Sequence, residues 1–157
     1  MDEATDRARK DALAFLKRHK TGVLGTVSPA GDAHASMVYY TADDDFNVYF
    51  LTLPGTRKYQ ALSAHPQVAF TVSVADVPAT LQLEGTAMDI SLDPDIAAKK
   101  DALMEVLNSN QWFYGPVAKL NPANVAVVWI RPRWVRWANY AFANGGADNV
   151  LQEIPLA

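Results

Sequence analysis

The sequence predicts a mainly β protein with flanking helices, folded as a small antiparallel barrel of six to seven strands. Seven short apolar runs rich in Val, Tyr, Phe and Thr, each bounded by turn residues, predict the strands. The first three runs are joined by short connections, which are typical of antiparallel neighbours. Half of the 157 residues are apolar, enough to fill the core of a single domain over 1–157.

The first expected element is an amphipathic helix over about 4–20. Side chains suited to a buried face recur there at spacings of three and four, and Arg and Lys fill the other face. The recurring residues are Ala8, Ala12, Phe15, Leu16 and His19. Gly22 is expected to end this helix, because glycine is a common helix terminator.

The strands follow this helix. Turn sequences SPAGD and ADDDFN separate the first three, which predicts an antiparallel meander. The sequence GTRK then predicts a short helix that links the third strand to the fourth. The expected strands cover 23–28, 33–41, 46–53, 67–75, 79–90, 124–131 and 133–140.

A further helix is predicted over 94–109, within the segment LDPDIAAKKDALMEVL. Asp93 can cap it, and Pro94 suits the first helical position, where the missing N–H leaves no hydrogen bond unmade. Ile96, Leu103 and Leu107 fall on one stripe, which predicts a buried face.

Composition excludes several classes of function. The net charge is −3, which argues against a nucleic-acid partner, and the absence of cysteine excludes disulfides, thiolate metal sites and cysteine nucleophiles. No apolar run is long enough to predict a membrane span, and the charged N-terminus does not resemble a signal peptide, so a cytoplasmic location is expected. The three histidines are scattered, and the acidic run 43–45 lacks the spacing of a calcium loop, so no metal site is expected.

The GTRK segment places two cations where a helix should disfavour them. Thr56 is the expected cap, and Arg57 and Lys58 fall in the first turn, where the helix dipole disfavours each cation by about 0.3–1 kcal/mol. A bound phosphate would reverse this penalty, because a helix N-terminus and basic side chains both attract anions. Hydroxyls of Thr52 and Thr56 could complete such a site. The alternative is that both cations extend into solvent.

The order of these pieces resembles the pyridoxamine 5′-phosphate oxidase-like family of FMN-binding split barrels. The resemblance rests on AHASMVYYTA, FNVYFLTLPGTRKYQAL, HPQVAFTV and LQLEGTAM, which follow one another as in that family from about Thr21 to Met88. The later segments WFYGP and RPRWVRWANY most resemble the general stress protein branch. The resemblance implies a split barrel that binds FMN in a cleft between the two subunits of a homodimer.

The resemblance also implies the cofactor-binding residues. The phosphate would be held by Thr52, Thr56, Arg57 and Lys58, and Leu51, which precedes Thr52 on its strand, would also contact the cofactor. The strand segment that faces the flavin ring would comprise Ser36, Met37, Val38 and Tyr39. Thr80 or Gln82 would lie near the flavin or its phosphate arm. Taken singly, Met37 and Val38 are more typical of a barrel core than of a flavin wall, and Ser36 could equally be an ordinary strand hydroxyl. His34 is the best placed histidine for a site, although a structural role is also open.

Aromatic residues near the C-terminus suggest a second contribution to the site. Tryptophans there are interleaved with arginines, a composition found in the buried centres of protein interfaces. Trp112 or Trp137 could therefore reach across a dimer and cover the partner's flavin. Core packing would use the same residues. The acidic balance disfavours the other interpretation, a stacking platform for single-stranded nucleic acid.

The expected function is that of an FMN-dependent oxidoreductase acting on a small-molecule substrate, with hydride exchanged at the flavin ring. The alternatives are a flavin-binding or stress-related module without dedicated turnover, and a relative that binds haem or a deazaflavin. Pyridoxamine 5′-phosphate oxidase activity itself is not expected, because the chain ends in NVLQEIPLA where that enzyme has an Arg-rich ending.

Overall fold

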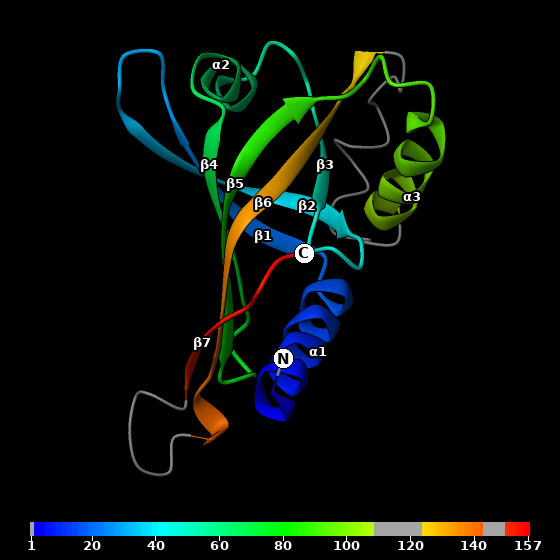
Figure 1. Ribbon diagram of the computed structural model, residues 1–157. Coiled ribbons are helices and arrows are strands. Elements are labelled where there is room, and N and C mark those ends of the chain that lie inside the picture. Colours follow the sequence, from blue (N-terminus) through cyan, green and yellow to red (C-terminus); the bar gives the residue numbers. More distant parts are fainter. Residues whose placement is uncertain (1, 109–123, 143–149) are drawn as a thin grey trace.

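A computed structural model describes residues 2–108, 124–142 and 150–157 of the chain. Strands make up most of the described fold, and three helices lie around them (Figure 1). In chain order the elements are α1 (Glu3–Arg18), β1 (Thr21–Val27), β2 (Ala33–Ala42), β3 (Val48–Thr52), α2 (Arg57–Ala64), β4 (Gln67–Ser73), β5 (Ala79–Asp89), α3 (Ile96–Asn108), β6 (Ala126–Asn139), a 3₁₀ turn (Tyr140–Phe142) and β7 (Leu151–Glu153).

The strands form one antiparallel sheet that closes on itself. Their order is β3-β2-β1-β4-β5-β6-β7, and an additional pairing of β3 with β6 joins six of them into a barrel, with β7 as an extra strand on β6. The expected meander of β1, β2 and β3 is present, and α2 links β3 to β4 as predicted. These pairings confirm the predicted fold class, a mainly β antiparallel split barrel with flanking helices.

Helix α1 packs on the barrel through the face that the sequence predicted. Its buried residues are Ala8, Ala12, Phe15 and Leu16. The Phe15 ring lies 5.0 Å from the Trp137 ring of β6, and the Tyr40 hydroxyl of β2 donates a 2.6 Å hydrogen bond to the Leu16 carbonyl. Because these contacts join residues far apart in sequence, α1 is fixed by packing rather than by helix propensity alone.

The boundaries of α1 and α3 differ from the sequence prediction. Gly22 does not end α1, which ends at Arg18; Gly22 pairs with Val38 inside β1. A Cβ atom at Gly22 would lie only 2.3 Å from the Phe70 ring, so close packing explains this glycine. Likewise, α3 begins at Ile96 instead of residue 94, because the Asp93 carboxylate accepts the Asp95 N–H in a turn before the helix.

The predicted break at Pro132 is also wrong, since 126–139 forms the single strand β6. Proline cannot donate to a ladder, and the structure accommodates it with a bulge, where the register shifts between Glu84 and Gly85 of β5. Gly85 lies opposite Pro132, and a Cβ atom there would lie 2.4 Å from the Arg131 carbonyl oxygen. Glycine therefore allows the two backbones to approach at the bulge.

The barrel is open between β2 and β3 at one end. β3 pairs with β2 only over Tyr40 to Ala42, and it then diverges to pair with β6 as far as Thr52. Among the described strands, the segment Ala33–Val38 of β2 pairs with β1 alone. The chain leaves β3 at this opening and immediately begins α2, which lies near the β1–β2 hairpin at the top of the view in Figure 1.

Candidate cofactor site at the start of helix α2

The start of α2 is built by two threonines. Thr56 caps the helix as predicted, and its hydroxyl accepts the Tyr59 N–H at 3.3 Å. The same hydroxyl lies 3.0 Å from the Thr52 hydroxyl, at the end of β3, and 2.9 Å from the Leu53 carbonyl oxygen. Since Thr52 is buried in the barrel, this contact fixes the helix start against the sheet.

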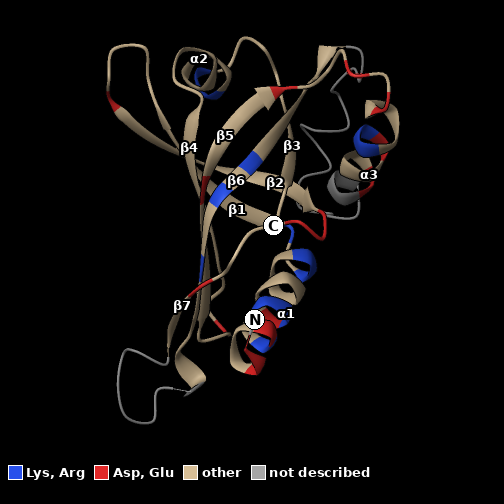
Figure 2. Cartoon of the chain, viewed as in Figure 1, with Lys and Arg blue, Asp and Glu red and all other residues tan. Residues whose placement is uncertain are grey.

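Two cations follow the cap without counter-charges. Arg57 is exposed and Lys58 half-buried, and α2 has no acidic residue in its first turn. Figure 2 shows basic residues and no acidic ones on α2. No carboxylate in the described part of the chain forms an ion pair with either cation. Partial burial lowers the pKa of Lys58 below its ordinary value of 10.5. A bound anion would offset both the desolvation of Lys58 and the unfavourable helix dipole.

Strand β2 presents its predicted site residues on two different faces. Val38 is buried in the core, and Ser36 shares that inner face because strand side chains alternate. Met37 lies on the outer face with 49% of its surface exposed, and Tyr39 points the same way. The Ser36 hydroxyl is shielded from solvent and has no hydrogen-bond partner among the described residues. A flavin on the outer face would therefore meet the side chains of Met37 and Tyr39, and only the backbone of Ser36 and Val38.

The β5 residues lie across the same outer face. Along one row of the sheet, Met37 is opposite Val23, Val23 is opposite Thr71, and Thr71 is opposite Gln82. Directly opposed side chains share a face, so Met37 and Gln82 are three strand spacings apart, or about 14 Å. Thr80 lies two residues before Gln82 on β5, and its hydroxyl is 3.3 Å from that of Ser73. Within one chain, Gln82 is thus not adjacent to Met37.

Comparison with known proteins identifies the family. A model of the family described as Pyridoxamine 5'-phosphate oxidase matches residues 8–138, which is most of the chain. The chain belongs to this family. A search of curated proteins found no match.

Solved structures share the same fold. An F420 reductase is 26% identical, with a TM-score of 0.61 over 78% of this chain and 93% of that one. General Stress Protein 26 from Bacillus anthracis str. Sterne is 20% identical, with a TM-score of 0.62 over 82% and 92%. A pyridoxamine 5'-phosphate oxidase-related, FMN binding protein from Nostoc punctiforme is 14% identical, with a TM-score of 0.59 over 96% and 93%. The structures that share this fold thus include an F420 reductase and an FMN binding protein.

Of the two tryptophans expected to cover a partner's flavin, the structure describes only Trp137. Trp137 is only 5% exposed and packs on Phe15 of α1, so the structure places it in the core, the alternative that the sequence left open. Trp112 lies outside the described residues. Leu51 is half-buried and packs against a small cluster that includes Tyr49 and Leu103, on the α3 side of β3.

A cavity beside α2 adds residues that the sequence analysis left undecided. It has a volume of about 440 Å³ and lies between the β1–β2 hairpin and the helix. Arg57 and Gln60 line it from α2, and Asp32 and His34 line it from the hairpin. The sequence analysis named His34 as the best placed histidine, but its proximity to Arg57 depends on how the helix packs against the hairpin. The cavity brings one predicted cation and the best placed histidine together.

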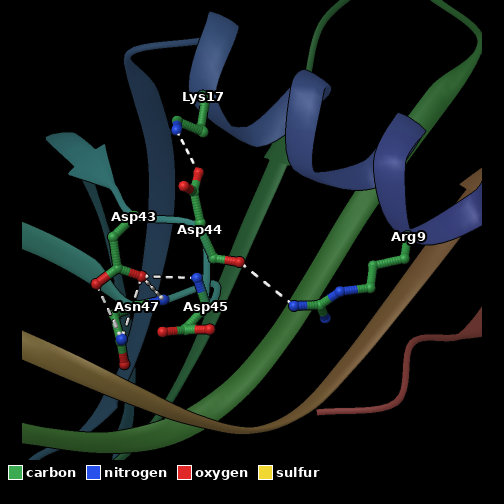
Figure 3. Close-up of polar contacts among 6 residues, drawn as sticks. All are labelled: Arg9, Lys17, Asp43, Asp44, Asp45 and Asn47. Atoms are coloured by element: carbon green, nitrogen blue, oxygen red, sulfur yellow. Dashed lines mark hydrogen bonds and ion pairs between the residues drawn. The ribbon is translucent and has the colours of Figure 1, made fainter. Parts of the chain in front are cut away.

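The acidic turn before β3 has a structural role. The Asp43 carboxylate accepts hydrogen bonds of 3.0–3.1 Å from the Asp45 N–H and from both the backbone and side-chain nitrogens of Asn47 (Figure 3). These contacts hold the hairpin that the sequence predicted. No group of potential ligands in the described residues could hold a metal ion. Likewise, none of the described helices is both long enough and apolar enough to cross a membrane.

Proposed function

We propose that the chain is an FMN-binding flavoprotein that acts as an oxidoreductase on a small-molecule substrate. The observation that carries this proposal is the pair of cations at the start of α2, which have no carboxylate partner in the described part of the chain. Arg57 can donate two parallel hydrogen bonds to a phosphate, and Lys58 adds a point charge. The capped helix N-terminus supplies backbone N–H groups to the same anion.

The outer face of the barrel suits a flavin ring. Met37 and Val23, 49% and 43% exposed, form an apolar surface next to the opening between β2 and β3. A flat ring system needs such a wall, with a few polar groups to orient it. When bound, FMN supplies hydride transfer, and the chain contributes mainly binding and orientation. The Met37 side chain would contact the ring, while Thr56, Arg57 and Lys58 hold the phosphate.

The proposed site extends over two subunits. Gln82 lies about 14 Å from Met37 across the sheet. A second copy of the chain could bring its own Gln82 to the flavin held by the first, which is the homodimer that the family resemblance implies. Exposed apolar residues on this face, Val23, Val27 and Met37, favour such a contact. Light scattering after size exclusion should then report about twice the 17.2 kDa chain mass. A flavin-loaded monomer would contradict the shared cleft.

The visible absorption spectrum of the purified protein tests the cofactor. Flavin, deazaflavin and haem have different spectra, so one measurement separates FMN from the two alternatives. Denaturation followed by chromatography of the released chromophore then distinguishes FMN from FAD. A haem spectrum would overturn the proposal.

A flavin-binding module without dedicated turnover is the second candidate. One feature of α2 favours this candidate. The hydroxyls of Thr52 and Thr56 and the guanidinium of Arg57 can bind a phosphate, but none of these three groups is an obvious general acid or base. Stopped-flow reduction by NADH or NADPH, followed by reoxidation with candidate acceptors, separates the two functions. Rapid reduction and acceptor-dependent reoxidation support the oxidoreductase, and a flavin that no donor reduces supports the module.

A further inference from the structure

A second pocket lies on the outer face of the barrel, away from α2. It has a volume of about 440 Å³ and crosses β1, β4, β5 and β6. Two rows of opposed residues form it. In one row, Gly25 is opposite Ala69, and Ala69 is opposite Glu84. These small residues leave a hollow, since even a Cβ atom at Gly25 would be 3.5 Å from its nearest neighbour, the Ala69 Cβ.

The adjoining row places an arginine at the edge of this hollow. Gln82 of β5 is opposite Arg136 of β6, and the two side chains are joined by hydrogen bonds. The Gln82 side-chain oxygen accepts from Arg136 Nε at 3.1 Å and from Nη2 at 2.5 Å. The Arg136 guanidinium also lies 5.3 Å from the centre of the Trp134 ring. Both neighbours hold the cation in place, but neither neutralises it.

Arg136 differs in this respect from the arginine nearest to it. Arg133 forms an ion pair with Glu84 at 3.2 Å, which also neutralises the one carboxylate that lines the pocket. Arg136 is half-buried, and no carboxylate in the described residues lies within ion-pair distance of it, although Glu153 of β7 is opposite it in register. The remaining guanidinium N–H groups have no acceptor among the described residues. A fixed, half-buried guanidinium with free donors is well suited to bind a carboxylate or phosphate.

We propose that this pocket binds the anionic group of a small-molecule ligand, with Arg136 donating to a carboxylate or phosphate monoester. The ligand's apolar body would occupy the hollow over Gly25 and Ala69, beside Val23. Gln82 acts here as a positioning residue, because it orients the guanidinium through two hydrogen bonds. The inference rests on the proposed flavin function, for which this ligand is the substrate.

Calorimetric titration of the full-length purified protein tests the proposal. The probes are benzoate and phenyl phosphate, and benzamide is a neutral control of the same shape as benzoate. Benzoate or phenyl phosphate should bind the natural protein. The Arg136→Gln variant should bind the same probe at least about tenfold more weakly, because a charge-assisted hydrogen bond is lost. The Arg131→Gln variant, which removes the same charge from another position on β6 that does not line the pocket, should bind as the natural protein does. Benzamide should bind none of the three measurably.

Several results would overturn the proposal. Equal affinity of Arg136→Gln and the natural protein for both anions would exclude Arg136 as the anion receptor. Equal binding of benzamide and benzoate would exclude an anion site. An Arg136→Lys variant, which keeps the charge but loses the fork, should show intermediate affinity and serves if Arg136→Gln does not fold.

The flavin absorbance of each variant separates this proposal from the proposed cofactor. Flavin content should be unchanged in Arg136→Gln, since the phosphate site lies at α2; loss of flavin there would instead make Arg136 a cofactor residue and overturn the substrate assignment. A different result would separate the two proposals. If neither the natural protein nor any variant contains flavin, but anion binding still depends on Arg136, then the proposed flavin function is wrong and the anion site is supported.

Discussion

The two turns that flank β3 carry opposite charges, and they differ in whether those charges form ion pairs within the described chain. The turn before β3 contains three consecutive aspartates, and the turn after it leads into Arg57 and Lys58. In the turn before β3, Asp44 forms contacts with basic residues of α1. Lys17 of α1 donates to the Asp44 carboxylate at 2.5 Å, and Arg9 donates to the Asp44 carbonyl oxygen at 3.3 Å (Figure 3).

The acidic turn thus connects the β2–β3 hairpin to α1 through these contacts. The Asp43 carboxylate also accepts the Tyr49 hydroxyl at 3.0 Å, and the Asn47 side-chain oxygen accepts the Trp129 indole N–H at 2.9 Å. Burial and the hydrogen bond to Asp43 both raise the pKa of Tyr49 above its ordinary value, so it stays a neutral donor. These contacts explain the geometry of the turn without any ligand.

At the other end of β3, no carboxylate of the described residues forms an ion pair with Arg57 or Lys58. The comparison teaches that a run of like charges indicates a binding site only where the fold leaves it unneutralised. Sequence alone does not separate the two cases, because both runs lie in turns next to the same strand.

The largest expected effect comes from removing the unneutralised cations. The double variant Arg57→Gln and Lys58→Gln should lose flavin on purification, because the phosphate loses both charged partners. Its stability should change by only about 0.5 kcal/mol, as for other substitutions near the surface. Flavin absorbance per protein and urea unfolding measure the two quantities. Full flavin occupancy in a folded double variant would refute the phosphate site.

The next effect should appear at the acidic turn and concern stability alone. Asp43→Ala removes the acceptor of the Asn47 side chain and the Tyr49 hydroxyl, which should lower the free energy of unfolding by about 1–3 kcal/mol. Asp45→Ala is the matched control and should be nearly neutral, because the Asp45 carboxylate forms no hydrogen bond with the described residues. Urea unfolding compares the two, and equal stabilities would show that the Asp43 contacts contribute little. Flavin content should not change in either variant.

A smaller effect should appear as a pH dependence of cofactor retention. Burial lowers the pKa of Lys58 from 10.5, so in the absence of a ligand this ammonium loses its proton at a lower pH than a free lysine does. A bound phosphate favours the charged form and raises that pKa. Flavin affinity should therefore be highest at neutral pH. It should fall as the pH rises toward 10.5, by up to about tenfold per pH unit.

Ultrafiltration of the flavin-loaded protein over a pH series measures this dependence. A Lys58→Arg variant should shift the loss of flavin to higher pH, because guanidinium stays charged there. If the natural protein and this variant release flavin at the same pH, then Lys58 does not contact the phosphate.

The smallest effect is expected when a neutralised cation is removed. The Lys17 ammonium donates a hydrogen bond to Asp44 and attracts it, which lowers the pKa of that carboxyl below 3.8. This pair stabilises the fold above pH 3.8, and the contribution is lost as pH falls through the lowered pKa. Lys17→Gln should return the Asp44 pKa toward 3.8, as seen by NMR titration, and leave flavin content unchanged. Flavin loss in this variant would mean that general charge, not the α2 site, holds the cofactor.

Much of the fold could be predicted because its signals are local. The cap at Thr56, the two cations after it and the turn at residues 43–47 are each contained in a few neighbouring residues. Strand alternation likewise accounts for the opposite faces on which Tyr39 and Tyr40 lie. The strand β7 gave too short a signal to be predicted, since it spans only Leu151–Glu153.

By itself, the sequence determined the order of strands and helices and the chemistry at the start of α2. Capping, alternation and turn formation act between residues close in the chain, so they leave a readable pattern. Only the tertiary structure decided which charges are neutralised and which residues meet. Lys17 and Asp44 are 27 residues apart, and Gln82 and Arg136 are 54 apart. Strand register and helix packing bring such pairs together, and no local pattern encodes either one.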